Sequence, residues 1–205
     1  MTHIRKAIQA DIPAVTAIYD HILTEEEAGR AAVGWIRGVY PTRQTAQDAL
    51  DAGDLFVLES DGVAAAAKIN QIQVPEYANA QWRYPDAPEG EIMVLHTLVV
   101  EPAQAGRGYG SAFVQFYEDY AREYGCSYLR MDTNARNLRA RALYKKLGYT
   151  EVAIVPCTEN GIPDVQLVLP ENLSADRRAL SRRIQNKAPI TFFVMGALFW
   201  WARMG

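Results

Sequence analysis

The chain has 205 residues, of which 49% are hydrophobic and 22% are charged. These proportions are typical of a globular protein and exclude a disordered or collagen-like chain. Its two cysteines, Cys126 and Cys157, belong to no CxxC or Cys/His cluster. This pattern excludes a disulfide scaffold and a zinc ribbon, so we expect a reducing compartment and no metal. The N-terminus lacks an apolar signal-peptide core, which predicts a cytoplasmic protein.

Charge is unevenly distributed along the chain. The net charge is −3, but residues 171–205 hold six Lys and Arg against two Asp and Glu. The preceding 1–170 is therefore acidic, which argues against nucleic acid as a ligand. We predict one domain over 1–170, followed by a tail over 171–205 that is first basic and then apolar.

Helical spacing, strand alternation and turn signals predict the elements of the domain in order. Strands are expected at 2–7, 55–59, 63–72, 91–100, 127–132, 149–155 and 165–169, and helices from Asp11, at 42–52, from the glycine-rich loop to 124, and at 137–147. The order β-α-α-β-β-β-α-β-α-β-β predicts an α/β fold, a mixed sheet flanked by helices on both sides, with a C-terminal helical extension.

The stretch HTLVVEPAQAGRGYGS, residues 96–111, leads from an apolar strand through Gly106, Gly108 and Gly110 into a helix. Glycines allow the backbone to approach a ligand closely, and the start of a helix favours phosphate. Arg107 adds a positive charge. The stretch contains no P-loop motif GxxxxGK[ST]. It also lacks a complete GxGxxG, because Ser111 stands at the third glycine position. A plain strand-to-helix turn remains the alternative.

The stretch NLRARALYKKLGY, residues 137–149, predicts a helix with Asn137 and Tyr144 on one face. Seven residues of helix separate them by about 10.5 Å, so an amide and a phenol can hold two parts of one extended ligand. The alternative is that Asn137 caps the helix and Tyr144 packs in the core.

Together the two stretches resemble the GNAT superfamily of N-acetyltransferases, and the resemblance covers about residues 1–170. The first matches the pyrophosphate motif [RQ]xxGx[GA] after a strand ending in V-x-P, except that Ala105 stands at the Arg/Gln position and Gln104 lies one residue early. The second matches N-x-x-A-x-x-[LF]-Y-x-x-x-G-[FY] at Asn137, Ala140, Leu143, Tyr144, Gly148 and Tyr149.

The resemblance implies that acetyl-CoA is the co-substrate and that an amine attacks its thioester directly. It implies that Tyr144 protonates the departing thiolate. The residues it assigns to acetyl-CoA are Leu98, Val99, Val100, Gly106, Arg107, Gly108, Tyr109, Gly110, Ser111 and Asn137.

The general base is less defined. His96 has an ordinary pKa suited to base chemistry at neutral pH, and alternation places it on the face of Val94 and Leu98. Asp132, at the end of the next strand, is a second candidate, Glu91 a weaker one, and a water chain is a further alternative.

The acceptor is expected to be a small-molecule or peptide amine. The irregular segment 71–89 carries Tyr77, Trp82 and Tyr84 among acidic residues, a composition that suits a cation. The alternative is that these aromatics pack on the body. Two other functions stay open: an acyl-CoA-binding sensor without turnover, and an adaptor whose tail carries the function.

The tail contains ITFFVMGALFWWA, residues 190–202, which is almost wholly apolar but shorter than the roughly 20 residues that span a bilayer. Its aromatic side chains gain about 1.5–3 kcal/mol each on burial. We expect them to cover the body, form a homodimer, or lie on a membrane surface as a peripheral contact.

A chain shortened to end at Leu173 tests the three alternatives. Light scattering should show a loss of mass if the tail forms a dimer, and sedimentation with anionic liposomes should show a loss of binding if the tail contacts a membrane. Unchanged mass and a full-length chain that ignores liposomes would contradict both. A lower melting temperature on shortening would then indicate docking on the body.

Overall fold

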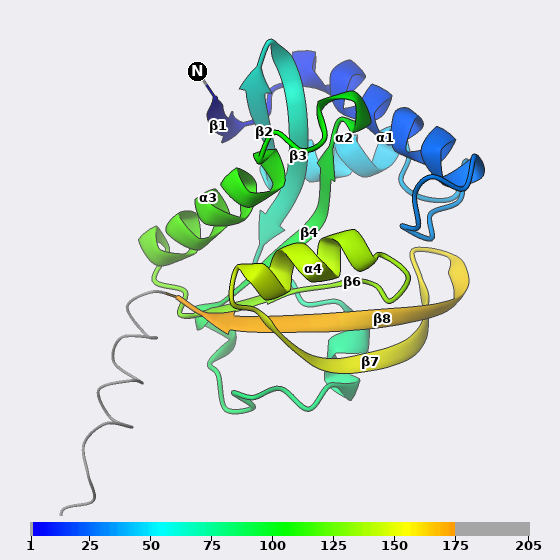
Figure 1. The fold of residues 1–205 in the computed structure, drawn as a ribbon. Coiled ribbons are helices and arrows are strands. Elements are labelled where there is room, and N and C mark those ends of the chain that lie inside the picture. Colours follow the sequence, from blue (N-terminus) through cyan, green and yellow to red (C-terminus); the bar gives the residue numbers. More distant parts are fainter. Residues whose placement is uncertain (1, 175–205) are drawn as a thin grey trace, which may run out of the picture.

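The computed structural model describes residues 2–174. The predictions for the tail beyond residue 174, including 190–202, lie outside the described residues. One mixed sheet forms the centre of the described part, with strand order β1-β2-β3-β4-β5-β8-β6 and with β7 paired to β8 (Figure 1). Of its pairings, only β4 with β5 is parallel.

The elements follow the order predicted from sequence, with one short strand added. Strands are β1 (His3–Lys6), β2 (Leu55–Ser60), β3 (Gly62–Asn70), β4 (Ile92–Val100), β5 (Tyr128–Met131), β6 (Thr133–Asn134), β7 (Thr150–Glu159) and β8 (Ile162–Leu173). Helices are α1 (Ile12–Glu27), α2 (Arg43–Asp51), α3 (Tyr109–Glu123) and α4 (Leu138–Lys146), with short 3-10 turns η1 (Gln9–Asp11), η2 (Pro75–Asn79), η3 (Glu89–Glu91) and η4 (Pro102–Gln104).

The last strand is longer than expected. It runs to Leu173, which pairs with Tyr128 of β5, so residues 171–173 belong to the sheet although we assigned them to the tail. Glu171 and Asn172 also pair with β5, opposite Arg130 and Leu129. The backbone hydrogen bonding of the sheet therefore continues past Pro170.

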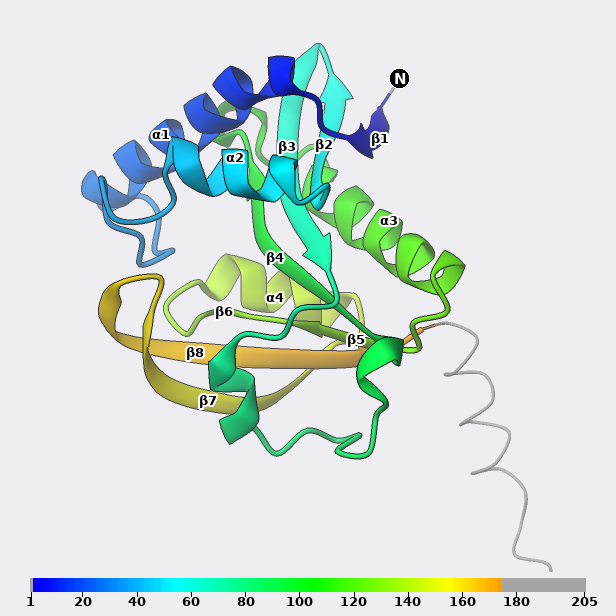
Figure 2. The same ribbon diagram turned by 180° about the vertical axis from the view of Figure 1, so that it is seen from behind.

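Helices cover both faces of the sheet, as predicted. The pair α3 and α4 lies on the face seen in Figure 1, and α1 and α2 lie on the opposite face, in front in Figure 2. Phe113 and Tyr117 of α3 are fully buried against the first face, and Ile12 and Val15 of α1 against the second. This burial fixes both layers on the sheet.

A bulge interrupts β4 at Thr97. Its φ is +50°, a conformation that a β-branched residue adopts only under constraint, and the pairing with β3 shifts register at this point. The bulge reverses the alternation, because Met93 and Leu95 pack in the same core as Leu98 and Val100. The prediction that His96 shares a face with Leu98 is therefore wrong.

The parallel pairing of β4 with β5 stops at Leu95. It extends from Ile92 opposite Tyr128 to Leu95 opposite Met131, whereas β4 itself continues to Val100. Beyond Leu95, the β5 side of β4 has no strand partner within residues 2–174. The two strands therefore separate and leave a wedge inside the sheet, lined by backbone N–H and C=O groups.

A buried ion pair ties the irregular segment 71–90 to the sheet. The Arg130 guanidinium lies 3.2 Å from Glu171, and their side chains are 4% and 0% exposed. Arg130 also donates to the Tyr84 carbonyl and to Gln73, and it stacks over Trp82 at 4.0 Å. The three aromatics of the segment pack in one core cluster with β4, β5, β7 and β8, so the packing alternative describes them.

Removing one partner of this pair should destabilise the fold strongly. Arg130→Met leaves the Glu171 carboxylate buried without a cation, so we expect the free energy of unfolding to fall by about 3–5 kcal/mol. Urea denaturation measures it. The double variant Arg130→Met/Glu171→Leu should recover much of the loss, because no charge is then left buried. A double variant as unstable as the sum of the two single variants would contradict the coupling.

Candidate active site

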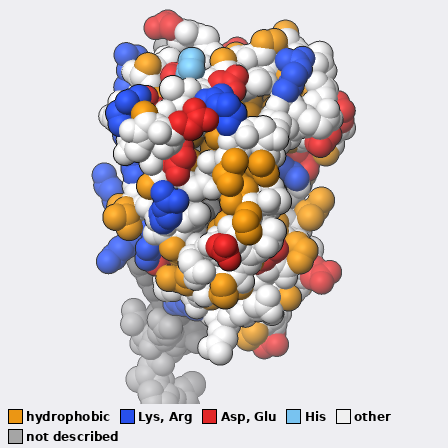
Figure 3. Space-filling view, turned by 90° about the vertical axis from the view of Figure 1, so that its right-hand side faces the viewer, with side chains coloured by type: hydrophobic (Ala, Val, Ile, Leu, Met, Phe, Trp, Pro, Cys, Tyr) orange, Lys and Arg blue, Asp and Glu red, His pale blue; other side chains and the backbone are white. Residues whose placement is uncertain are grey.

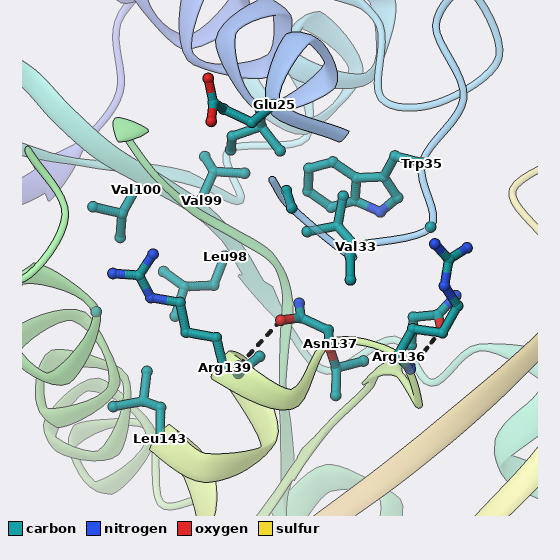
Figure 4. A pocket seen from close by; sticks show the side chains of 18 of the residues that line it. Glu25, Val33, Trp35, Leu98, Val99, Val100, Arg136, Asn137, Arg139 and Leu143 are labelled. Carbon is teal, nitrogen blue, oxygen red and sulfur yellow. Dashed lines mark hydrogen bonds between the residues drawn. The ribbon is translucent and has the colours of Figure 1, made fainter. Parts of the chain in front are cut away.

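The wedge between β4 and β5 opens into a cleft of about 760 Å³. It is bounded by β4, the glycine-rich loop, α4, the loop over 28–42 and the tip of the β7–β8 hairpin (Figure 4). Most predicted site residues line it: Leu98, Val99, Val100, Gly106, Gly108, Tyr109, Gly110, Ser111, Asp132, Asn137 and Tyr144. Of the described residues predicted for the site, Arg107, His96 and the weaker base candidate Glu91 do not line it.

One end of the cleft has the properties of an anion site. Gly106 and Gly108 adopt positive φ, and a Cβ built at either would meet no atom within 4 Å. The N–H groups of Tyr109, Gly110 and Ser111 begin α3 and find no acceptor in the part of the chain that the structure describes. Unpaired N–H groups at a helix start favour a phosphate.

Two arginines add positive charge near this end. The side chain of Arg139 extends from α4 toward Val100 (Figure 4), and it lines the cleft. Arg107 is exposed within the glycine-rich loop itself.

Helices α3 and α4 meet closely beside the glycine-rich loop. A Cβ at Gly110 would lie 3.1 Å from Leu143 Cδ2, which is tighter than ordinary packing. Glycine at this position therefore sets the distance between the two helices, in addition to any contact with a ligand.

Asn137 both caps α4 and faces the cleft. Its Oδ1 accepts from the Ala140 N–H at 3.1 Å, as the capping interpretation predicts. Figure 4 shows the side chain directed into the cleft opposite Leu98. The amide nitrogen remains on the cleft side and is available as a donor.

Tyr144 presents a hydroxyl to the cleft from α4. The residue is only 6% exposed, and burial together with the nearby charge of Asp132 raises the pKa of its phenol well above the usual value. No group within residues 2–174 hydrogen-bonds this hydroxyl. It is therefore a protonated and uncommitted donor at neutral pH.

His96 lies beside the cleft. Its Nε2 lies 3.1 Å from the Ile72 carbonyl oxygen and 3.2 Å from Asn70 Oδ1. Because the carbonyl only accepts, Nε2 carries the proton and Nδ1 faces Asp132 Oδ2 at 4.0 Å. Burial and Lys68 lower the pKa of His96 to about 4, so the imidazole is neutral.

Two carboxyl groups lie at the other end of the cleft from the anion site, and sequence reasoning found only one of them. Asp132 and Glu159 both line the cleft. Burial raises the pKa of Asp132 to about 6, and burial together with the charge of Asp132 raises the pKa of Glu159 to about 8. The predicted strand over 149–155 ended before Glu159, so the sequence did not reveal that β7, which extends to Glu159, delivers this carboxylate to the site.

The loop over 28–42 closes this end, and sequence reasoning gave it no role. Trp35 and Tyr40 line the cleft with their rings edge to face at 5.8 Å. The hydroxyl groups of Tyr40 and Thr97 hydrogen-bond each other. The hairpin tip lies against this loop, because a Cβ on Gly161 would be 3.4 Å from the Val39 side chain. On this side of the molecule, hydrophobic side chains gather between charged ones (Figure 3).

Residues 2–174 contain no group of three or more His, Cys, Asp and Glu side chains arranged to hold a metal ion. None of the helices described is both long and apolar enough to span a membrane.

The fold and the cleft define an acyltransferase, and comparison with known proteins identifies the family. A family model described as the acetyltransferase (GNAT) family matches residues 16–149. The chain belongs to the GNAT acetyltransferase family.

Relatives of known structure share the fold. An acetyltransferase of the GNAT family from Streptococcus agalactiae superposes with a TM-score of 0.70 at 18% identity, covering 84% of this chain and 95% of that chain. An acetyltransferase from Salmonella typhimurium, solved with its cofactor acetyl-CoA, superposes with a TM-score of 0.61 at 20% identity, covering 84% and 94%.

A curated relative matches over a shorter segment. The mycothiol acetyltransferase of Beutenbergia cavernae is 40% identical over 81 residues, which are 40% of this chain. The match spans only 26% of that protein's length.

Proposed function

We propose that this chain transfers an acetyl group from acetyl-CoA to a primary amine by direct attack of the amine in a ternary complex. The observation that supports this most is the wedge after Leu95, where β4 leaves backbone groups unpaired. An extended chain with amide groups can add to such an edge like a strand. The pantetheine arm of acetyl-CoA has this chemistry.

The lining of the cleft fits the rest of acetyl-CoA. Backbone groups of Leu98, Val99 and Val100 would pair with the pantetheine arm, and the Asn137 amide would donate to it. The loop from Gly106 to Ser111, including Tyr109, would hold the pyrophosphate through backbone N–H groups, with Arg107 and Arg139 adding charge. Acetyl-CoA supplies an activated acyl thioester. No metal is needed for this attack.

The residues of the chain then handle protons. The amine must lose a proton before it attacks, and the thiolate must gain one as the C–S bond breaks. The Tyr144 hydroxyl, which no group within residues 2–174 hydrogen-bonds, would donate the second proton. No covalent enzyme intermediate is required, which leaves Cys126 and Cys157 without a role in this proposal.

The chemical class of the acceptor follows from the side chains of this chain's own cleft. Likeness to a mycothiol acetyltransferase supports acetyl transfer, but the shared segment is about a quarter of that relative. A small-molecule or peptide amine fits the carboxylates at the closed end. Thiol release on addition of amines separates this function from that of an acetyl-CoA sensor, which would bind without turnover.

The glycine-rich loop can be tested at Gly108. Gly108→Val places a side chain in the open space where the phosphate would approach, so we expect acetyl-CoA affinity to fall at least about 100-fold, because the backbone donors are no longer accessible. Isothermal titration calorimetry measures the dissociation constant.

The matched control is Gly125→Val. Gly125 also has positive φ and open space around a built Cβ, but it lies at the far end of α3. It should lose comparable stability and keep its affinity. Normal affinity in Gly108→Val would refute the pyrophosphate assignment.

The role of Tyr144 can be tested by removing one oxygen. Tyr144→Phe keeps the ring and deletes the donor, and general acid catalysis contributes about 10²–10⁴-fold. We expect kcat to fall at least tens of fold with acetyl-CoA affinity unchanged. Tyr149→Phe is the control, because its ring lies 6.2 Å from that of Tyr144 but does not line the cleft. Equal kcat in the two variants would make Tyr144 a packing residue.

A further inference from the structure

The closed end of the cleft gathers carboxyl groups. Arg136 also lines the cleft, but its guanidinium is paired with Glu26 at 3.5 Å. Asp132 and Glu159 line it, and Glu76 of η2 is near enough for its charge to raise the pKa of both. No Lys or Arg within residues 2–174 forms a salt bridge with Asp132 or Glu159. Among these described residues, the basic side chain that approaches Asp132 is His96, whose neutral imidazole has its Nδ1 4.0 Å from Asp132 Oδ2.

The other titratable groups facing the carboxyls are weak acids. Tyr40 from the loop over 28–42 and Tyr77 from η2 both have raised phenol pKa values because they are buried and lie near Asp132. Cys157 on β7 has a thiol pKa raised to about 11 by burial and by Glu159. With Tyr144 these groups stay protonated and neutral near pH 7, so none supplies a positive charge.

The two carboxyl groups differ in what holds them. Asp132 Oδ2 accepts the Tyr77 hydroxyl at 2.8 Å, which fixes it at the floor of the cleft. Glu159 lies at the end of β7, next to the hairpin turn, and the hydrogen bond recorded for its carboxylate comes from the neighbouring Asn160 amide at 3.3 Å. Glu159 is therefore the carboxylate that can turn to meet a ligand and take a proton from it.

The walls around the carboxyls are apolar. Trp35 and Tyr40 lie on the loop side, and Ile162 and Val165 of β8 lie on the hairpin side. The loop is held in place because Glu26 accepts from the Val33 N–H at 2.7 Å. A ligand that fills this end brings a positive charge to the carboxyls and an apolar body to the walls.

We propose that Glu159 accepts the proton from an ammonium group bound beside Asp132, and that the acceptor is a primary amine with an apolar body and no carboxylate next to its nitrogen. The inference rests on the proposed acetyl transfer. One ammonium N–H proton moves to a Glu159 oxygen, the freed lone pair forms the new C–N bond, and the thiolate takes the Tyr144 proton as the C–S bond breaks. The nitrogen then releases its second proton, which restores the Tyr144 phenol, so the products are the neutral amide and the free thiol. A carboxylate beside the nitrogen would be repelled by Asp132 and Glu76, and by Glu159 once Glu159 has lost its proton.

The first experiment compares Glu159→Gln with Asp164→Asn, an equivalent change at an exposed position on the same hairpin. Substrates are butylamine and phenethylamine, each measured by thiol release, with phenylalanine as the carboxylated counterpart of phenethylamine. In the unaltered chain we expect the amines to react and phenylalanine to react at least tenfold more slowly. Glu159→Gln should lower kcat/KM about 100-fold near pH 7, with acetyl-CoA affinity and melting temperature unchanged.

The pH dependence of kcat/KM distinguishes a base from a structural residue at Glu159, because loss of a merely structural contact would not change that dependence. In the unaltered chain kcat/KM should rise with pH until the carboxyl pair has lost its protons, near the pKa of Glu159 at about 8, and then level off. The Glu159→Gln variant cannot deprotonate the bound ammonium, so only acceptor that is already unprotonated in solution reacts. Its kcat/KM should therefore keep rising up to the pKa of the acceptor, about 10 for an alkylamine. Asp164→Asn should reproduce the unaltered profile.

The outcomes separate this inference from the proposed function. If the chain binds acetyl-CoA in calorimetry but neither amine releases thiol, or phenylalanine reacts as fast as phenethylamine, the amine subsite is wrong and acetyl-CoA binding stands. If Glu159→Gln keeps kcat/KM within threefold and the same plateau, Glu159 is not the base. If acetyl-CoA does not bind, the proposed function fails and this inference fails with it.

Discussion

The separation of β4 from β5 is the constraint on which the rest of the site depends. Parallel strands normally satisfy each other's backbone groups along their whole shared edge, but here the pairing ends at Leu95 while β4 continues to Val100. Backbone polar groups away from a strand partner need water or a ligand. The bulge at Thr97 and the hydrogen bond between Thr97 and Tyr40 hold the second half of β4 in place beyond its pairing with β5. The wedge is therefore a property of the fold itself.

Two close backbone approaches shape the cleft around that wedge. Gly110 lets α3 come near Leu143 of α4, and Gly34 lets the loop over 28–42 come near Asn134, whose side-chain amide a Cβ at Gly34 would meet. Gly34 also has positive φ, so both sterics and backbone conformation favour glycine there. One contact positions the glycine-rich loop and the other closes the carboxylate end.

Sequence patterns predicted what local physics controls. The helices and strands follow from period 3.6 and period 2 spacing, and the residues of the glycine-rich loop and of α4 line the cleft because a strand, a tight turn and a helix must follow one another there. Asn137 was predicted as a ligand contact, with a helix cap as the alternative; the cap is confirmed, and the ligand contact stays a prediction. Sequence patterns did not predict the features that depend on tertiary contacts.

The bulge at Thr97 is one such case, because strict alternation placed Leu98 on the face of His96. Glu159, Trp35 and Tyr40 are others. They lie in a hairpin and in a loop, far along the chain from the glycine-rich loop, and only the pairing of β7 with β8 and the docking of the loop over 28–42 bring them to the cleft. No spacing rule links residues that meet in this way.

The electrostatic polarity of the cleft follows from these elements and has a consequence for orientation. One end offers the start of α3 with Arg107 and Arg139, and the other offers Asp132 and Glu159. A ligand with phosphates at one end and an uncharged reactive group at the other is stabilised in one direction only, because reversing it would bring phosphates against carboxylates. The same polarity attracts a cation to the end where an uncharged thioester would lie. Under the proposed function, these two charged ends would bring the anionic co-substrate and a cationic acceptor together beside the Tyr144 hydroxyl.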